Sequence, residues 1–175
     1  ARRYEQRSLA QSMGLGTERA DRLPDWLCGY DLVVNTAPAR VLGVEELSAL
    51  LTLAEKEEWP WMTVGNGSNL LVRDGGFDGL VIRLQKNFSM IQRKENTLWA
   101  QAGALLSALS REALSAGLTG LEFAQGIPGT VGGGAYMNAG AYGGELGQSI
   151  SQVRVFNGQE VLSLPGREMD FSYRH

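Results

Sequence analysis

The chain has 175 residues, of which 43% are hydrophobic and 20% are charged, and its formal net charge is −3. These values are ordinary for a globular chain that is large enough to form a core, and they give no electrostatic reason to expect nucleic acid or an anionic membrane as a partner. One cysteine and one histidine cannot supply a Cys/His metal site, so no metal is expected. No apolar run approaches the length of a membrane span and no secretory signal opens the chain, which favours the cytoplasm.

Residues 1–43 are predicted to form an atypical α/β segment. Leu9 and Met13 fall on one face of a helix over residues 1–13, and the arginines on its other faces indicate a solvated surface rather than a binding patch. Asp31–Val34 has the pattern of a short buried strand, with a turn after it.

Residues 44–85 are predicted to form a first lobe. Its clearest element is a helix over Val44–Glu58, whose apolar residues recur at the spacing of one buried face. Those residues are Leu47, Leu50, Leu51 and Ala54. Three short strands are expected after the helix, separated by polar turns that contain glycine. The strands are Trp61–Val64, Leu70–Val72 and Leu80–Leu84, and the turns are Gly65–Asn69 and Asp74–Gly76.

The turn at Gly65–Asn69 is a candidate anion site. Its glycines allow successive backbone N–H groups to converge on an anion, and Ser68 and Asn69 add side-chain donors. Such a turn would suit the pyrophosphate of a dinucleotide, although an ordinary turn between strands has the same composition. The segment lacks the third glycine and the following helix of the G-x-G-x-x-G fingerprint.

Residues 86–175 are predicted to form a second lobe. Alternating apolar residues predict a strand over 98–102, and a helix is expected over 105–116 with Gly117 as its cap. Asn157-Gly158 between two alternating runs predicts a β-hairpin.

The glycine-rich segment 126–147 lies between that helix and that hairpin. Nine of its 22 residues are glycine, which indicates positive φ angles or a very close approach of the backbone to a neighbour. Apolar residues fill the gaps between the glycines, so the segment differs from a flexible linker. We expect a packed wall against a flat ligand or phosphates. Tyr136 and Tyr142 are expected to be packing residues rather than ligands, and Trp59, Trp61 and Trp99 to be core or lobe-interface aromatics.

Four motifs, in order along the chain, resemble the UDP-N-acetylenolpyruvoylglucosamine reductase family, also called the UDP-N-acetylmuramate dehydrogenases. They are Gly65-Asn-Gly-Ser-Asn-Leu-Leu-Val72, Gly126-Ile-Pro-Gly-Thr-Val-Gly-Gly133, Met137-Asn-Ala-Gly-Ala-Tyr-Gly-Gly-Glu145 and Tyr173-Arg174. The resemblance implies an α/β (α+β) fold with two FAD-binding lobes of the vanillyl-alcohol oxidase type and FAD between them. It also implies NADPH-dependent reduction of enolpyruvyl-UDP-N-acetylglucosamine to UDP-N-acetylmuramate in peptidoglycan synthesis.

The same resemblance assigns the FAD site to two parts of the chain. The first turn would hold the pyrophosphate through its backbone amides, and its residues are Gly65, Asn66, Gly67, Ser68 and Asn69. The wall would approach the ribityl chain and the isoalloxazine, where several Cβ atoms would be in the way. Its cofactor-binding residues would be Gly126, Ile127, Pro128, Gly129, Thr130, Val131, Gly133, Ala139, Gly140 and Ala141.

The family's Tyr-Arg motif falls on Tyr173 and Arg174. Arg174 is the candidate catalytic residue, because a fixed guanidinium would stabilise the negative charge that builds on the substrate carboxylate. Tyr173 would bind substrate by shaping the pocket. Without the resemblance, Arg174 would be taken as a solvated arginine. Glu122 and Glu145 could orient the flavin, or could simply be hydrophilic turn residues.

Two parts of the sequence depart from the family. Its C-terminal domain binds the UDP-sugar and supplies a serine and a glutamate, and neither residue can be assigned here. We therefore expect this chain to hold FAD without turning over substrate. Residues 1–43 differ from the family's usual opening, and Asp31–Leu42 weakly resembles a Rossmann segment of dipicolinate synthase-like proteins.

Alternatives from other classes stay open. One is another flavoenzyme of the vanillyl-alcohol oxidase type, for which His175 would be the candidate for covalent flavin attachment. A second is a non-catalytic module that binds flavin or a partner protein. A third is a Rossmann NAD(P) dehydrogenase, which rests on residues 31–42. The sequence leaves the oligomeric state open.

Overall fold

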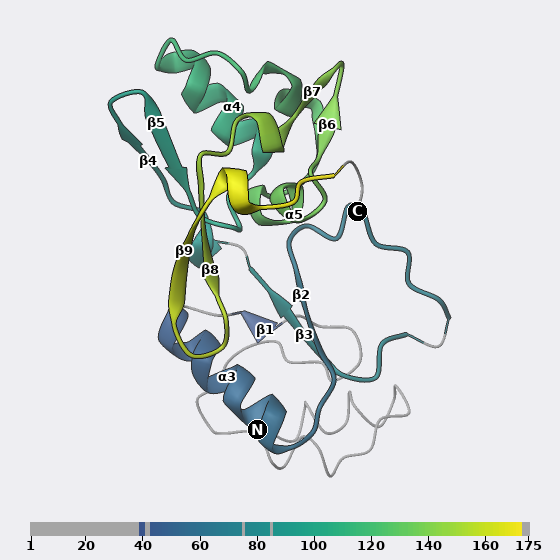
Figure 1. Cartoon of the computed structure of the whole chain (residues 1–175). Helices are drawn as coiled ribbons and strands as arrows, with labels where there is room; N and C mark the ends of the chain where they lie inside the picture. The colour runs from purple at the N-terminus through teal and green to yellow at the C-terminus, as the bar shows by residue number, and fades with distance from the viewer. Residues whose placement is uncertain (1–38, 41–42, 75, 85, 173–175) are drawn as a thin grey trace. The chain divides into compact units, whose positions relative to one another are not determined.

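The computed structural model describes residues 39–40, 43–74, 76–84 and 86–172 (Figure 1). The helix and strand expected before residue 39 lie outside the described residues, as do Tyr173 and Arg174. The chain divides into two compact units. The first contains the described residues up to Val64 together with Leu70–Arg83, and the second contains Gly65–Asn69 together with the described residues from Leu84 onward. The turn expected in the first lobe thus belongs to the second unit.

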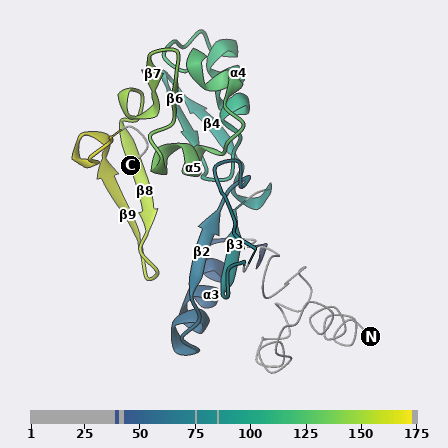
Figure 2. The ribbon, with the colours of Figure 1, turned by 90° about the vertical axis from the view of Figure 1, so that its right-hand side faces the viewer.

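The first unit contains a parallel sheet. Its strands lie in the order β1 (Ala39–Arg40), β3 (Leu80–Arg83), β2 (Trp61–Val64), and β3 is parallel to both neighbours. Parallel neighbours need a long crossover connection. Helix α3 (Val44–Lys56) lies in the connection between β1 and β2, and residues 65–79 connect β2 to β3. Figure 2 shows β2 and β3 side by side, with α3 beside them.

Helix α3 confirms the predicted helix and its buried face. Leu47, Leu50, Leu51 and Ala54 are all buried. The helix ends two residues earlier than expected, because Glu57 leaves helical geometry at its C-cap and Glu58 has a φ of 53°. Two glutamates in the first turn and Lys56 in the last turn interact favourably with the helix dipole.

The strand predicted at Leu70–Val72 is wrong. This segment forms no strand, and its three side chains are 48%, 97% and 61% exposed. It lies in the crossover between β2 and β3, where no strand of the described ranges pairs with it. A run of apolar residues shows that the residues suit a strand. It does not show whether another strand is available to pair with them.

The second unit contains three antiparallel hairpins. They are β4 (Ile91–Lys94) with β5 (Thr97–Ala100), β6 (Gly140–Ala141) with β7 (Gly144–Glu145), and β8 (Gln152–Phe156) with β9 (Val161–Pro165). The turn predicted at Asn157-Gly158 is confirmed, and Gly158 has a φ of 98°. Strand β4 was not predicted, since exposed polar residues occupy most of it.

Short helices complete the second unit. The predicted helix is confirmed as α4 (Leu106–Ser115), and Gly117 after it has a φ of 69°. Helix α5 (Val131–Tyr136) was not predicted. Single turns of 3₁₀ helix are η2 (Lys86–Phe88), η3 (Glu122–Gly126), η4 (Leu146–Gln148) and η5 (Gly166–Glu168). The mixed helix and strand content of the α/β (α+β) prediction is confirmed.

The core of the second unit forms where α4, η3 and η4 meet. Leu106, Ala124 and Leu146 are at most 2% exposed. Partly buried apolar residues surround them, namely Leu121, Phe123, Ile127, Val131, Ala139 and Ile150. This buried cluster holds the glycine-rich segment in position, because several of its members belong to that segment.

None of the helices in the described ranges combines the length and the apolarity that crossing a membrane requires.

Replacing Leu106 by alanine tests this core. We expect the free energy of unfolding to fall by about 2–5 kcal/mol, because the leucine is fully buried and its removal leaves a cavity. Urea denaturation followed by circular dichroism measures the change. Leu114→Ala on the same helix is the matched control, since Leu114 is 79% exposed and its loss should cost no more than about 0.5 kcal/mol. Equal losses in the two variants would contradict the assigned core.

Candidate functional site

Two glycine-rich segments that are far apart in the sequence meet in the second unit. A Cβ atom on Gly65 would overlap Oγ1 of Thr130 and would lie 2.9 Å from its Cγ2. Ser68 lies beside the wall as well, because its Oγ is 3.9 Å from the position that a Cβ on Gly129 would take. The turn at Gly65–Asn69 and the start of the wall therefore form one continuous surface.

The backbone of the wall is held by the segment that leads into α4. Leu106 N–H donates to the carbonyl of Gly129 at 3.0 Å, and Val131 N–H donates to the carbonyl of Ala104 at 2.7 Å. Gly132 N–H continues the series by donating to the carbonyl of Ala102 at 2.8 Å. These hydrogen bonds hold the start of the wall in place, although its glycines have a weak propensity to form a helix.

Thr130 is the N-cap residue of helix α5, and it is 3% exposed. Its Oγ1 accepts a long hydrogen bond from Gly133 N–H at 3.4 Å and so caps the helix. Three consecutive glycines follow within α5, and glycine normally disfavours a helix interior. Two of them are required by contact, since a Cβ on Gly132 would lie 2.7 Å from Ala102 Cβ and one on Gly134 would lie 2.8 Å from Leu146 Cδ1. Close approach therefore explains these glycines.

The turn at Gly65–Asn69 presents donors that the protein does not use. The N–H groups of Gly67, Ser68 and Asn69 make no hydrogen bond within the part of the chain that the structure describes. All three residues are exposed, and Gly67 has a φ of 70°. Consecutive N–H groups of this kind form an anion-binding concavity.

Open space borders the site at two glycines. No atom lies within 4 Å of a Cβ placed on Gly67 or on Gly126. Gly126 is exposed and its φ is not positive, so neither packing nor backbone strain requires glycine there. Gly140 differs, because a Cβ there would lie 2.7 Å from the carbonyl oxygen of Gly144 across the β6–β7 hairpin. A ligand against the wall would have room beside Gly126, so the residues present fit a phosphate-bearing group.

The remaining candidates occupy several environments. Ile127 and Val131 pack on the core, and Pro128 is exposed. Ala139, Gly140 and Ala141 are partly buried in and before the β6–β7 hairpin. Glu122 has a structural contact, because its carboxylate accepts from Gly120 N–H at 2.8 Å. Glu145 is partly buried at the N-cap of η4.

The packing role expected for two tyrosines is wrong. Tyr136 is 83% exposed at the end of α5, and Tyr142 is 98% exposed in the turn between β6 and β7. Tyr142 adopts a φ of 54°, and Gly143 after it adopts 85°. The left-handed turn directs the Tyr142 ring into solvent. Both rings belong to the surface of the glycine-rich segment.

Asn138 is a structural residue of the site that the sequence did not single out. It is 1% exposed and has a φ of 42°, a conformation that asparagine tolerates better than most residues. Its Oδ1 accepts from Gly147 N–H at 2.8 Å, and its buried Nδ2 has no partner among the described residues. Its position in the Met-Asn-Ala-Gly motif, next to glycines, was the available signal.

Asn138→Ala should lower the free energy of unfolding by about 1–3 kcal/mol, because it leaves the partly buried Gly147 N–H without its acceptor. Asn157→Ala is the matched control. The Asn157 Oδ1 accepts from Gln159 and Glu160 N–H in an exposed turn, where water can replace it. Chemical denaturation should show a smaller loss for the control. A larger loss for Asn157→Ala would contradict the anchoring role of Asn138.

Comparison with known families and proteins bears on this site. A family model described as "FAD binding domain" matches residues 38–162. UDP-N-acetylenolpyruvoylglucosamine reductase from Clostridioides difficile is 44% identical over 131 residues, which cover 74% of this chain and 43% of that protein. The protein of the same name from Oceanobacillus iheyensis is 48% identical over 130 residues, covering 74% of this chain and 42% of that protein.

A solved structure agrees with these relatives. The crystal structure of UDP-N-acetylenolpyruvylglucosamine reductase from Thermus caldophilus matches with a TM-score of 0.64 and 39% identity, covering 77% of this chain and 47% of that one. This chain thus spans less than half the length of the relatives that it matches.

Proposed function

Because the chain belongs to the FAD binding domain family, we propose that it forms the flavin-binding part of a reductase of peptidoglycan synthesis. The proposed reaction converts UDP-N-acetyl-enolpyruvoylglucosamine to UDP-N-acetylmuramate in the cytoplasm, with NADPH as the hydride donor. The relatives that carry the reductase name support this assignment. The observation that carries it is the meeting of the Gly65–Asn69 turn with the wall at Thr130.

The turn is proposed to hold the pyrophosphate of FAD. The unused N–H groups of Gly67, Ser68 and Asn69 would donate to phosphate oxygens, and Gly65 and Asn66 would complete the loop around them. Gly65 lies directly against Thr130, so any side chain there would push the turn away from the wall. The geometry of the donors would therefore depend on this close contact.

The wall is proposed to lie along the ribityl chain and the isoalloxazine. The open space beside Gly126 would receive the cofactor, and Pro128 and Gly129 would continue this surface toward the turn. Gly133, together with Ala139, Gly140 and Ala141, would form the rest of the surface. The vanillyl-alcohol-oxidase-type arrangement, with FAD between two lobes, is part of the same proposal.

FAD, when bound, supplies the hydride-transfer chemistry, and the residues of the chain supply placement and charge. Arg174 would stabilise the negative charge that develops on the substrate carboxylate. Tyr173 would shape the pocket beside it. The UDP-sugar would be the substrate on which these two residues act.

The absorption spectrum of the purified chain, mixed with FAD and then desalted, tests the cofactor. We expect flavin bands near about 370 and 450 nm, which belong to the isoalloxazine. Gly126→Ala should weaken FAD binding by about tenfold or more, since its methyl group would occupy space that the ligand needs. It should leave the unfolding transition of the apoprotein unchanged, because no atom lies within 4 Å of the added Cβ.

Gly43→Ala is the matched control. A Cβ on Gly43 also meets no atom within 4 Å, and Gly43 lies before α3 in the first unit. Its FAD affinity, measured by flavin fluorescence titration, should equal that of the unchanged chain. Equal affinity in Gly126→Ala would remove the wall from the cofactor site, and absence of flavin binding by the unchanged chain would refute the proposed function.

The reaction itself is tested by mass spectrometry of the product. The chain is loaded with FAD, and the part of the Clostridioides difficile relative beyond its match is added in trans, with NADPH and the enolpyruvyl substrate. We expect UDP-N-acetylmuramate to form, and Arg174→Ala to slow its formation about 100-fold or more while flavin content stays the same. Unchanged product formation in Arg174→Ala would rule out the charge-stabilising role.

A further inference from the structure

A pocket apart from the glycine-rich site lies in the second unit. Its volume is about 630 Å³, and it is lined by Gln92, Arg93, Lys94, Trp99 and Arg154. Three of these five residues are cations and none is an acid. The whole chain has a net charge of −3, so this pocket is positively charged on a negatively charged protein. Its lining residues differ from all those assigned to the flavin.

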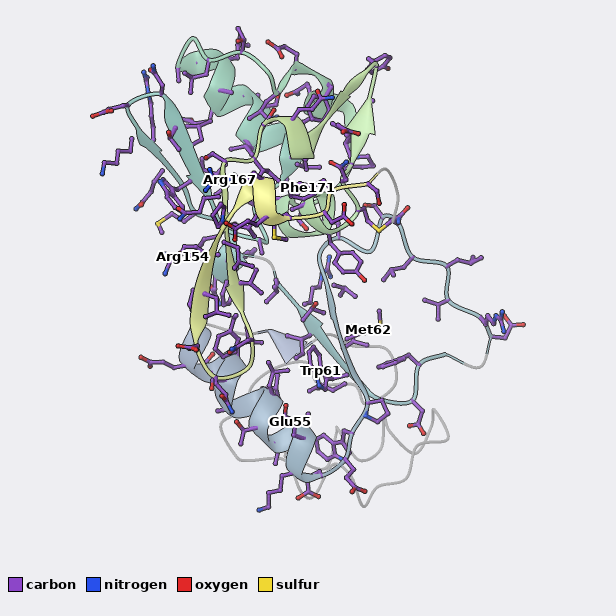
Figure 3. The ribbon with its side chains drawn as sticks, viewed as in Figure 1. Glu55, Trp61, Met62, Arg154, Arg167 and Phe171 are labelled. Atoms are coloured by element: carbon purple, nitrogen blue, oxygen red, sulfur yellow. The ribbon has the colours of Figure 1, made fainter. Side chains whose placement is uncertain are left out.

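Two hairpins supply the lining of this cationic pocket. Gln92 and Lys94 lie two residues apart on β4, so their side chains share one face of the hairpin, and Arg93 between them projects from the other face. Trp99 lies directly opposite Gln92 on β5. Arg154 extends from β8, as Figure 3 shows, and lies opposite Ser163 of β9. The pocket therefore has regular strands on both sides.

Among the described residues, no acidic side chain pairs with the three cations of the pocket. None of Arg93, Lys94 and Arg154 forms an ion pair within the described part of the chain. Arg93 Nε donates to the carbonyl oxygen of Glu95 at 2.9 Å, which orients the guanidinium and leaves its terminal N–H groups for other acceptors. Like charges brought together in this way repel one another, and a bound anion would relieve that repulsion.

The pocket also offers an aromatic surface. Trp99 is 39% exposed, so of the two positions expected for it, in the core or at a lobe interface, the core position is wrong. An accessible indole ring is suited to stacking on a nucleobase. Gln92 Nε2 donates to Met90 Sδ at 3.2 Å, which orients the amide beside the ring. One pocket thus contains both cations that can bind phosphates and an aromatic ring that can stack on a base.

We propose that this pocket binds a nucleoside polyphosphate. Lys94 and Arg154 contact the phosphates, the base stacks on Trp99, and Arg93 adds positive charge from the neighbouring position of β4. The depression is open to solvent, so a ligand would lie along it, and guanidinium groups match phosphate geometry with paired N–H donors. This inference does not depend on the proposed flavin function, because it uses other residues and another ligand.

Isothermal titration calorimetry of the purified chain with GTP, carried out with and without FAD present, tests the proposal. Arg154→Glu should weaken GTP binding about tenfold or more, since it removes a charged hydrogen bond and adds repulsion. Trp99→Ala should weaken GTP binding and leave tripolyphosphate binding unchanged. Arg111→Glu is the matched control, because Arg111 is exposed on α4 outside the pocket and the net charge changes equally. Circular dichroism verifies that each variant is folded.

Four outcomes would overturn the proposal. One is the absence of GTP binding at millimolar concentration, and another is an equal loss in Arg154→Glu and Arg111→Glu, which would indicate general charge attraction. Tripolyphosphate binding as tightly as GTP would leave the base without a role. A single-stranded oligonucleotide that outcompetes GTP, with its binding lost in Arg154→Glu, would make this surface a nucleic-acid site.

Discussion

The contact of Gly65 with Thr130 is the constraint on which the candidate cofactor site depends. It brings a turn that follows β2 against a helix cap located much later in the chain. Thr130 can both cap α5 and contact Gly65, because hydrogen bonds to residues 104 and 106 hold the backbone on either side of it and its side chain is buried. With this contact in place, the turn is positioned by the protein before any ligand arrives. Preorganised donors of this kind need little rearrangement on binding, which favours affinity.

Much of the regular structure could be predicted because local patterns decide it. The buried face of α3 follows from leucines at helical spacing, and α4 ends where Gly117 can adopt a positive φ. The β8–β9 hairpin follows from Asn157-Gly158 between alternating runs. Both halves of the candidate site were also identified from composition and from family resemblance. Their adjacency is a tertiary contact between distant parts of the chain, and only the structure shows it.

The remaining features depend on distant neighbours. The sequence suggests a strand at Leu70–Val72, yet a strand exists only where another strand pairs with it. The glycines of α5 argue against a helix, but hydrogen bonds to Ala102 and Ala104 hold that segment in place. Tyr142 is exposed because its own left-handed φ, followed by that of Gly143, directs it outward. Residue type alone gave no sign of any of these outcomes.

The assignment of the Gly65–Asn69 turn to the second unit bears on how this polypeptide can be divided. The chain passes from one unit to the other at Val64–Gly65, at Asn69–Leu70 and again at Arg83–Leu84. No single cut in the backbone therefore releases both units whole. A cut before Leu84 would separate the wall from the turn that lies against it. A fragment that keeps the turn together with the wall must therefore also contain residues 70–83 of the first unit.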